Sequence, residues 1–259
     1  MNLTSPSQVK AWCIEHDFHP NKVLGQNFLI DRNVLEAIVD AGLENGAKKV
    51  VEIGPGLGVL TEEMLNRGVQ VTAVEKDPVL AARLAESLGN PPALKVVAGD
   101  ALKVELPQAD AMVSNLPYQA GTRILLELVL KRQYPAMTVL VQSEVAERLA
   151  AAEGGKTRGL AGVWAQLDYD VEVLRKVAAS CFWPRPAIGS SVVRLKRHDR
   201  NLGLAGEVRD MFHRITKQAF EHRRKQLGSI FKDFVQSTAR AEELSNHDWI
   251  ELAKGLCGQ

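Results

Sequence analysis

The chain has 259 residues, of which 46% are hydrophobic and 24% charged, and its net charge is +1. These values are ordinary for a globular protein and leave room for one large domain or for a large and a small one. No apolar run approaches the ~20 residues that a membrane-spanning helix needs, and residues 1–10 lack the basic-then-apolar pattern of a secretion signal. We therefore expect a soluble, cytoplasmic protein.

Neither metal nor disulfide chemistry is indicated. The three cysteines, Cys13, Cys181 and Cys257, are scattered and form no C-x-x-C pair, which argues against a zinc site or a disulfide framework. The six histidines show no metal-ligand spacing either. We expect no bound metal.

Strands and helices are predicted to alternate through the first part of the chain. Asp31 is a candidate N-cap for a helix that ends near Gly42. Buried strands are predicted at residues 49–53, 69–74, 94–97, 109–113 and 137–141, and helices at residues 59–67, 78–88 and 122–131. This alternation predicts an α/β fold, with a doubly wound, mostly parallel sheet and helices on both faces.

The pattern changes after residue 152. A flexible, partly basic loop at residues 153–159 precedes a predicted helix at 160–167, and two further strands are predicted at 170–177 and 191–196, as an antiparallel pair at the sheet edge. From Gly206 onward the pattern is helical with no strand candidates. We therefore predict two domains, an α/β domain at residues 1–200 and a smaller all-helical domain at residues 201–259.

A glycine-rich turn, Gly54-Pro55-Gly56-Leu57-Gly58, follows the first strand of this sheet. Glycines there let the backbone approach a ligand closely. Glu75 ends the next strand, 21 positions after Gly54, where its carboxylate can accept hydrogen bonds from ribose hydroxyls. A nicotinamide-dinucleotide enzyme would share these features, and a solvated strand end is the alternative for Glu75 alone.

Three features favour S-adenosylmethionine as the cofactor. The glycine spacing is G-x-G-x-G rather than the dinucleotide G-x-G-x-x-G. Asp100 ends the third strand, where it can accept a hydrogen bond from an adenine amine. The fourth strand ends in Asn115-Leu116-Pro117-Tyr118, at the carboxyl edge where doubly wound sheets bind ligands.

The stretch Asn115–Tyr118 suits a flat base that carries an exocyclic amine. The Asn115 side-chain oxygen and the Leu116 carbonyl can both accept hydrogen bonds from the amine. Pro117 has no backbone N–H and biases Leu116 toward an extended conformation, and Tyr118 offers a ring face for stacking. A plain strand-to-loop turn is the alternative for these four residues alone.

With these motifs in place, the chain resembles the ribosomal RNA adenine dimethyltransferases from about Gly25 to Leu252. Further motifs that carry the resemblance are Gly25-Gln26-Asn27-Phe28-Leu29, Gly99-Asp100, residues 142–148, Phe182-x-Pro184-x-Pro186, residues 190–195, Phe220-x-x-Arg223-Arg224-Lys225 and Arg240-Ala241-Glu242-x-Leu244-Ser245. The resemblance implies a Rossmann-like class I methyltransferase domain followed by a helical rRNA-binding domain. It also implies dimethylation of N6 on two adjacent adenines near the 3′ end of small-subunit rRNA, during ribosome assembly.

The resemblance and the residue chemistry together give two sets of site residues. Cofactor contacts are predicted for Gln26, Asn27, Leu29, Gly54, Gly56, Glu75, Lys76, Asp100, Ala101 and Asn115. The target base is predicted to lie against Asn115, Leu116, Pro117, Tyr118 and Phe182, although Phe182 could instead be a core residue.

Basic residues are concentrated between Arg194 and Lys225, where ten Lys/Arg stand against four acids, an excess of six. Such an excess suits phosphates, although a solvated helical surface is the alternative on charge alone. Phosphate contacts are predicted for Arg194, Lys196, Arg197, Arg223, Arg224 and Lys225. The expected partners are small-subunit rRNA and the immature small ribosomal subunit, and the protein is expected to be a monomer.

Three alternatives stay open. An NAD-dependent dehydrogenase would leave Asn115–Tyr118 unexplained, and a non-enzymatic assembly factor would leave the cofactor residues unused. A large-subunit rRNA methyltransferase of the macrolide-resistance type shares less of the motif at residues 182–186. The chain departs from the family pattern at Gln119-Ala120-Gly121, in a less basic N-terminal tail, and in a short segment between Phe234 and Arg240.

Overall fold

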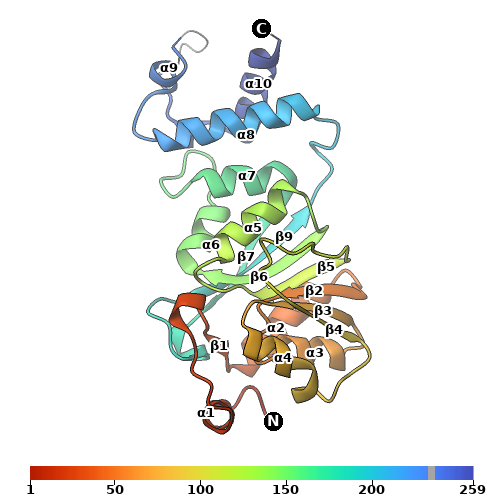
Figure 1. The fold of residues 1–259 in the computed structure, drawn as a ribbon. Helices are drawn as coiled ribbons and strands as arrows, with labels where there is room; N and C mark the ends of the chain where they lie inside the picture. The colour runs from red at the N-terminus through yellow and green to blue at the C-terminus, as the bar shows by residue number, and fades with distance from the viewer. Residues whose placement is uncertain (233–236, 259) are drawn as a thin grey trace. The chain divides into compact units, whose positions relative to one another are not determined.

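The computed structural model describes residues 1–232 and 237–258, so part of the short segment after Phe234 lies outside the described residues. The centre of the fold is a seven-stranded sheet in the order β4-β3-β2-β5-β6-β9-β7 (Figure 1). Its strands are β2 (Lys49–Ile53), β3 (Gln70–Glu75), β4 (Leu94–Ala98), β5 (Ala111–Asn115), β6 (Ala136–Gln142), β7 (Tyr169–Val177) and β9 (Ser190–Arg197).

The sheet is doubly wound, as predicted. From β2 the strand order runs through β3 to β4 on one side and through β5 to β6 on the other, and all four of these pairings are parallel. β9 is antiparallel to β6, and β7 lies next to β9 at the edge. Right-handed crossovers in opposite directions from one strand place helices on both faces of such a sheet.

Helices flank the sheet in the order that the periodicity predicts. They are α2 (Arg32–Leu43), α3 (Val59–Asn66), α4 (Pro78–Ser87) and α5 (Gly121–Leu130). A further helix, α6 (Ser143–Leu149), was not predicted. The predicted N-cap of α2 is confirmed, because Asp31 Oδ1 accepts the Val34 N–H at 2.9 Å. The fourth strand begins at Ala111, two residues later than predicted.

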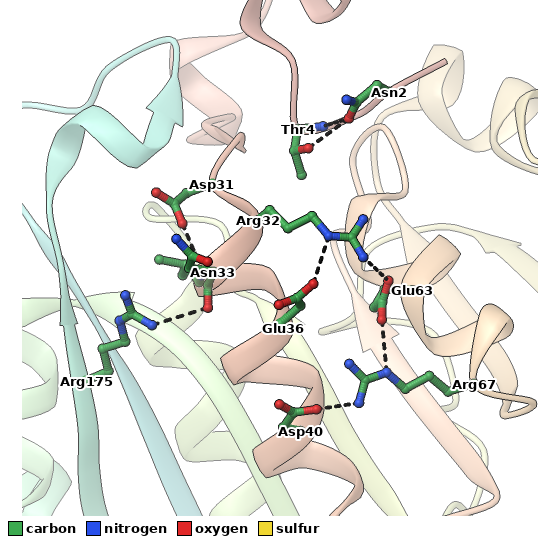
Figure 2. Close-up of polar contacts among 11 residues, drawn as sticks. Asn2, Thr4, Asp31, Arg32, Asn33, Glu36, Asp40, Glu63, Arg67 and Arg175 are labelled. Atoms are coloured by element: carbon green, nitrogen blue, oxygen red, sulfur yellow. Dashed lines mark hydrogen bonds and ion pairs between the residues drawn. The ribbon is translucent and has the colours of Figure 1, made fainter.

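Ion pairs fasten α2 to α3 (Figure 2). Arg32 contacts Glu36 at 2.8 Å and Glu63 at 3.8 Å, and Arg67 contacts both Glu63 and Asp40. Because these groups are partly exposed, each pair stabilises the fold only slightly. The network nevertheless joins the helix that follows residues 25–29 to the helix that follows the glycine turn.

Several short elements were not predicted. Helix α1 (Pro6–Glu15) buries Val9, Trp12 and Cys13 against Phe18, Phe28 and Leu57. Strands β1 (Phe28–Leu29) and β8 (Phe182–Trp183) form a separate antiparallel pair, and 3₁₀ turns lie at Lys22–Leu24 and Ala179–Cys181. Two-residue strands show no periodicity in a sequence, so only the folded chain shows that residues 28–29 and 182–183 are paired.

The chain divides into two compact units, Met1–Ala146 with Glu172–Lys196, and Glu147–Val171 with Arg197–Gln259. The second unit contains α7 (Leu160–Asp168), α8 (Gly206–Glu221), α9 (Leu227–Ile230), a 3₁₀ turn (Ala241–Glu243) and α10 (Asn246–Cys257), together with the first residues of β7. Among the described residues, no helix combines the length and apolarity required to cross a membrane.

This division differs from the predicted boundary at residue 200, because residues 147–171 cluster with the helical unit. Val163 and Leu167 belong to the same hydrophobic cluster as Phe212 and Trp249. Both carboxylate oxygens of Asp168 also accept hydrogen bonds from Arg209, at 2.7 and 2.9 Å. Such packing joins residues far apart in the chain, so local periodicity does not indicate it.

Candidate active site

A cavity of about 180 Å³ lies at the carboxyl ends of β2, β3, β4 and β5. Its lining includes all ten residues predicted to bind the cofactor: Gln26, Asn27, Leu29, Gly54, Gly56, Glu75, Lys76, Asp100, Ala101 and Asn115. Leu116, Pro117 and Tyr118 line it as well. The fold thus gathers around one cavity residues that the sequence spreads over almost one hundred positions.

The cavity opens where β2 and β5 separate. The two strands pair through Val50 with Ala111 and Val51 with Met112. Farther along, the buried Ser114 hydroxyl accepts the Ile53 N–H at 2.8 Å. Where the connections that follow two neighbouring parallel strands run to opposite sides of the sheet, a crevice forms at the carboxyl ends of these strands. Doubly wound sheets bind ligands in this crevice.

Gly54 begins the glycine turn directly beside the Asn115–Tyr118 stretch. Its φ of 70° is in the left-handed region, which disfavours a side chain, and a Cβ there would lie 3.3 Å from Pro117 Cδ. The Gly54 N–H donates to Val74 O at 2.9 Å. A residue larger than glycine would therefore disturb both the turn and the wall opposite it.

Glu75 is a nearly buried carboxylate, 6% exposed, at the end of β3. Oε2 accepts the Gly56 N–H at 3.1 Å and Oε1 accepts the Asp77 N–H at 2.8 Å. Burial raises the pKa of Glu75, and these hydrogen bonds oppose that rise. Because each carboxylate oxygen can accept more than one hydrogen bond, Glu75 retains capacity for ligand hydroxyls.

Asp100 follows β4 and is held as an ionised acceptor. Oδ1 accepts the Leu102 N–H at 3.0 Å, and Oδ2 forms an ion pair with Lys76 Nζ at 3.0 Å. These two contacts lower the pKa of Asp100. The pair also places the predicted contacts Lys76 and Asp100 next to each other on the cavity wall.

Gln26 fixes the loop that precedes β1. Its Nε2 donates to Asp77 Oδ2 at 2.9 Å, and its Oε1 accepts the Asn21 N–H at 2.7 Å. Asp77 Oδ1 in turn caps α4 by accepting the N–H groups of Val79 and Leu80. With both ends of its amide engaged, Gln26 positions the loop, and its contact with a cofactor stays a prediction.

Asn115 lines the cavity and carries an acceptor without a partner among the described residues. Its Nδ2 donates to the main-chain carbonyl of Asn27 at 3.1 Å. Its Oδ1 is buried and has no hydrogen-bond partner among the described residues. Since a buried polar atom normally has a partner, this oxygen suits a ligand that donates a hydrogen bond.

Tyr118 and Phe182 lie close together but in different surroundings. The Tyr118 hydroxyl and Ser190 Oγ are 2.5 Å apart, and the two rings meet edge-to-face with centroids 6.4 Å apart. Phe182 is 2% exposed and belongs to the main hydrophobic cluster. Phe182 therefore lies where a core residue would, which was the alternative to a base contact. Stacking of Phe182 on a base stays a prediction.

Three residues of the site were not predicted: Glu52, Asp77 and Ser114. Each left a signal in the sequence, because Glu52 and Ser114 interrupt apolar strands and Asp77 precedes a proline at a helix start. Glu52 is 1% exposed and accepts a hydrogen bond from the Thr61 hydroxyl at 2.5 Å. Its burial raises its pKa to about 8.

Comparison with known proteins identifies the family. A sequence model described as ribosomal RNA adenine dimethylase matches residues 17–253, nearly the whole chain. The chain belongs to the ribosomal RNA adenine dimethylase family. The predicted class of enzyme, an rRNA adenine dimethyltransferase, is thereby confirmed.

Relatives of this dimethylase support the assignment. It is 44% identical over 196 residues to ribosomal RNA small subunit methyltransferase A of Deinococcus radiodurans, with 74% of this chain and 67% of that protein covered. It is 36% identical over 277 residues to the protein of the same name from Chlamydia caviae, with 97% of each covered.

Solved structures of other methyltransferases share the fold. A dimethyladenosine transferase from Plasmodium falciparum superposes with a TM-score of 0.74 at 22% identity, covering 86% of this chain and 95% of that one. The 23S rRNA methyltransferase ErmE superposes with a TM-score of 0.71 at 26% identity, covering 89% and 100%. These similarities confirm the predicted class I methyltransferase fold.

The six basic residues predicted to contact RNA lie in both units of the dimethylase. Arg194 and Lys196 belong to the first unit, and Arg197, Arg223, Arg224 and Lys225 belong to the second. Lys196, Arg224 and Lys225 are exposed. Their exposure suits phosphate contacts, which stay a prediction.

Two of the six are engaged within the protein. Arg194 forms ion pairs with Glu44 and Glu172, so these carboxylates offset its charge. Arg223 lies 3.5 Å from a carboxylate oxygen of Glu242 and donates to the Lys156 carbonyl. These contacts make Arg194 and Arg223 weaker candidates for RNA than the exposed residues.

No group of three or more His, Cys, Asp or Glu side chains in residues 1–232 and 237–258 is arranged to hold a metal ion.

Proposed function

We propose that the cavity binds S-adenosylmethionine and that the protein uses it to dimethylate adenine N6 in small-subunit rRNA. The single observation that carries the proposal is that Glu75, Asp100 and Asn115 line one cavity, and that Asn115 Oδ1 is buried without a hydrogen-bond partner among the described residues. Glu75 suits the ribose hydroxyls and Asp100 the adenine amine of the cofactor. When bound, S-adenosylmethionine supplies an electrophilic methyl group on a sulfonium.

The protein's own part in the reaction is to position the target amine. The adenine amine is a poor nucleophile because its lone pair is delocalised into the ring. Hydrogen bonds to Asn115 Oδ1 and to the Leu116 carbonyl would polarise the amine and direct its lone pair. Such positioning can contribute several kcal/mol, roughly 7 or more in well-oriented systems. No general base is required before attack, since the cationic product amine loses its proton to water.

The target base must leave its stack to reach this cavity. The proposed stacking partner is a ring face of Tyr118, whose hydroxyl is hydrogen-bonded to Ser190. The Phe182 ring meets the Tyr118 ring edge-to-face. A base on an aromatic ring is stabilised by roughly 1–3 kcal/mol. Dimethylation further requires that the same acceptors tolerate an amine that already carries one methyl group.

The substrate is proposed to be two adjacent adenines near the 3′ end of small-subunit rRNA, within the immature small subunit. The names of relatives that are 36–44% identical over most of the chain support the small subunit. Exposed basic residues in both units, such as Lys196 and Arg224, are proposed to contact phosphates. We further propose that the protein acts as a cytoplasmic monomer in ribosome biogenesis.

Incubation of the protein with unmethylated small ribosomal subunits and methyl-labelled S-adenosylmethionine tests this function. Mapping of the modified bases should give N6,N6-dimethyladenine at two adjacent positions near the 3′ end. Binding to the subunit with no transfer would favour a non-enzymatic assembly factor. Transfer only to large-subunit rRNA would favour a methyltransferase of the macrolide-resistance type.

A further inference from the structure

The main-chain carbonyl of Asn27 lies against the side-chain amide of Asn115. We propose that this carbonyl is a positioning group for methyl transfer, because it holds Asn115 Nδ2 and so leaves Oδ1 as the acceptor for the target amine. The carbonyl would also explain why residue 115 is an amide rather than a carboxylate. This inference rests on the proposed function.

The chemistry of the contact fixes the orientation of the Asn115 amide. A carbonyl oxygen only accepts hydrogen bonds, so the group 3.1 Å from Asn27 O has to be the NH₂ of Asn115. The opposite orientation would bring two acceptor oxygens together. Asn115 Oδ1 therefore lies on the other side of the amide, buried and unpartnered among the described residues.

The carbonyl is itself held by a turn that lies directly on the Asn115–Tyr118 stretch. Gly25 has a φ of 69°, and a Cβ on it would lie 2.9 Å from Tyr118 N and 3.0 Å from Gln119 N. Asn27 Nδ2 donates to Gly25 O at 3.2 Å. Two residues later, Leu29 pairs with Phe182 across β1 and β8.

The loop at residues 25–29 thus contacts both parts of the acceptor site. Through Asn27 it orients Asn115, and through Leu29 it pairs with the strand that carries Phe182. Its residues also line the cavity proposed for the cofactor. A single hydrogen bond, from Asn115 Nδ2 to Asn27 O, therefore links the loop that lines the proposed cofactor cavity to the orientation of the acceptor amide.

A carboxylate at position 115 distinguishes this arrangement from a simple need for an acceptor oxygen. In Asn115→Asp, an ionised side chain would place an oxygen against Asn27 O, and the repulsion would displace it. A protonated side chain would restore the pattern, since its hydroxyl can donate to Asn27 O and its carbonyl oxygen can accept from the amine. Activity of the variant should therefore follow the protonated fraction.

The test compares single-turnover methyl transfer by the wild type and by Asn115→Asp, with saturating S-adenosylmethionine and rRNA substrate, between pH 6 and pH 9. The ratio of variant to wild-type rate should rise about tenfold for each unit of pH decrease while the new carboxyl is mostly ionised. Taking the ratio compensates for the other titratable groups that line the cavity, which are the same in both proteins: Glu52, Glu75, Lys76, Asp100 and Tyr118.

A ratio that is constant with pH, or that rises with pH, would overturn the inference. If the variant shows no measurable transfer, the pH dependence of its melting temperature tests the inference instead. Burial and repulsion by Asn27 O both raise the pKa of the new carboxyl, so the deficit in melting temperature relative to the wild type should grow as pH rises. A deficit independent of pH would also overturn the inference.

The outcome separates this inference from the proposed function. A wild-type protein that transfers no methyl group to adenine rejects the function itself, whatever the variant does. A wild type that methylates adenine, beside a variant whose rate ratio and stability deficit do not change with pH, rejects only the role of the Asn27 carbonyl. Calorimetric titration of both proteins with S-adenosylmethionine confirms that the cofactor site is folded.

Discussion

Two buried carboxylates face the same cavity from neighbouring strands. Glu52 and Glu75 are 1% and 6% exposed, and each has a raised pKa that burial causes. Their partners differ, because Glu52 accepts from a buried hydroxyl whereas Glu75 accepts from two backbone N–H groups. The difference suits Glu75 for a ligand and Glu52 for a structural role.

Replacing Glu75 by alanine should weaken binding of S-adenosylmethionine by more than tenfold, which corresponds to about 1.4 kcal/mol or more. The variant loses the proposed acceptor for the ribose hydroxyls and the partner of the Gly56 N–H. Isothermal titration calorimetry gives the dissociation constant directly. Glu36→Ala is a matched control, because Glu36 is partly exposed and pairs with Arg32. An unchanged constant in Glu75→Ala would reject the ribose contact.

Glu52 should make stability depend on pH. Its pKa in the folded protein is raised from 4.5 to about 8, so the folded state binds this proton more tightly than the unfolded chain. The resulting stabilisation is complete below about pH 4.5 and is lost as the pH rises through about 8. Glu52→Gln cannot ionise and should therefore gain stability relative to the wild type over that range.

Urea unfolding of the wild type and of Glu52→Gln at several pH values between 5 and 9 measures the effect. The free energy of unfolding of the wild type should fall relative to the variant as the pH rises. Glu36→Gln serves as the control, because its carboxylate is partly exposed. If the difference in free energy of unfolding between wild type and Glu52→Gln is the same at every pH in this range, Glu52 does not have the raised pKa of a buried, protonated carboxyl.

At the scale of elements, the N-terminus of α4 connects helix stability to the site. Asp77 caps the helix and also holds Gln26, whose other end binds the Asn21 N–H. Ser245 caps α10 in the other compact unit, where it accepts the Asp248 N–H at 3.0 Å. Both residues cap the N-terminus of their helices, but only Asp77 contacts the loop at residues 25–29.

Asp77→Ala and Ser245→Ala should each lower the free energy of unfolding by about 1 kcal/mol, because each helix loses its cap. Only Asp77→Ala should also weaken cofactor binding, several-fold, since Gln26 loses its anchor. Thermal unfolding and calorimetric titration of both variants measure the two effects. Equal cofactor affinities in the two variants would show that the Gln26–Asp77 contact has no part in the site.

The elements that the sequence predicts well are those with a repeated local pattern. The strands of the central sheet are short apolar runs, and the acids Glu75 and Asp100 lie at strand ends that a parallel sheet brings to one edge. The predicted cofactor set therefore follows from topology together with the glycine turn. Its members line one cavity, while their individual contacts to a cofactor stay predictions.

The features that were missed depend on long-range contacts. The hydrogen bond from Asn115 to Asn27 joins residues 88 positions apart, and β1 pairs with a strand more than 150 residues away. The assignment of residues 147–171 to the helical unit depends on packing of Val163 and Leu167. Local periodicity does not indicate which distant segment a given segment contacts, because each segment could pack against many others.

At the scale of the whole molecule, the net charge of +1 gives little attraction for RNA. We therefore expect binding to depend on local basic residues, of which Arg224 and Lys225 are exposed and adjacent. Each phosphate contact contributes roughly 0.7–0.9 to the slope of log K against log salt concentration. The slope therefore counts contacts without a structure of the complex.

The double variant Arg224→Ala/Lys225→Ala should bind small-subunit rRNA more weakly and with a slope reduced by about 1–2. Fluorescence anisotropy over a series of salt concentrations measures both quantities. Lys131→Ala is the control, because Lys131 is exposed and lies outside the predicted set. A double variant with the slope of the wild type would mean that these two residues contact no phosphate.

The most direct test of the central claim is the rate of methyl transfer by Asn115→Ala at saturating S-adenosylmethionine and rRNA. The variant lacks the side-chain oxygen that we propose holds the target amine. Its rate should therefore fall at least ~100-fold, about 2.7 kcal/mol, while calorimetry shows cofactor affinity within a few-fold of the wild type. Near-normal transfer by Asn115→Ala would contradict the account.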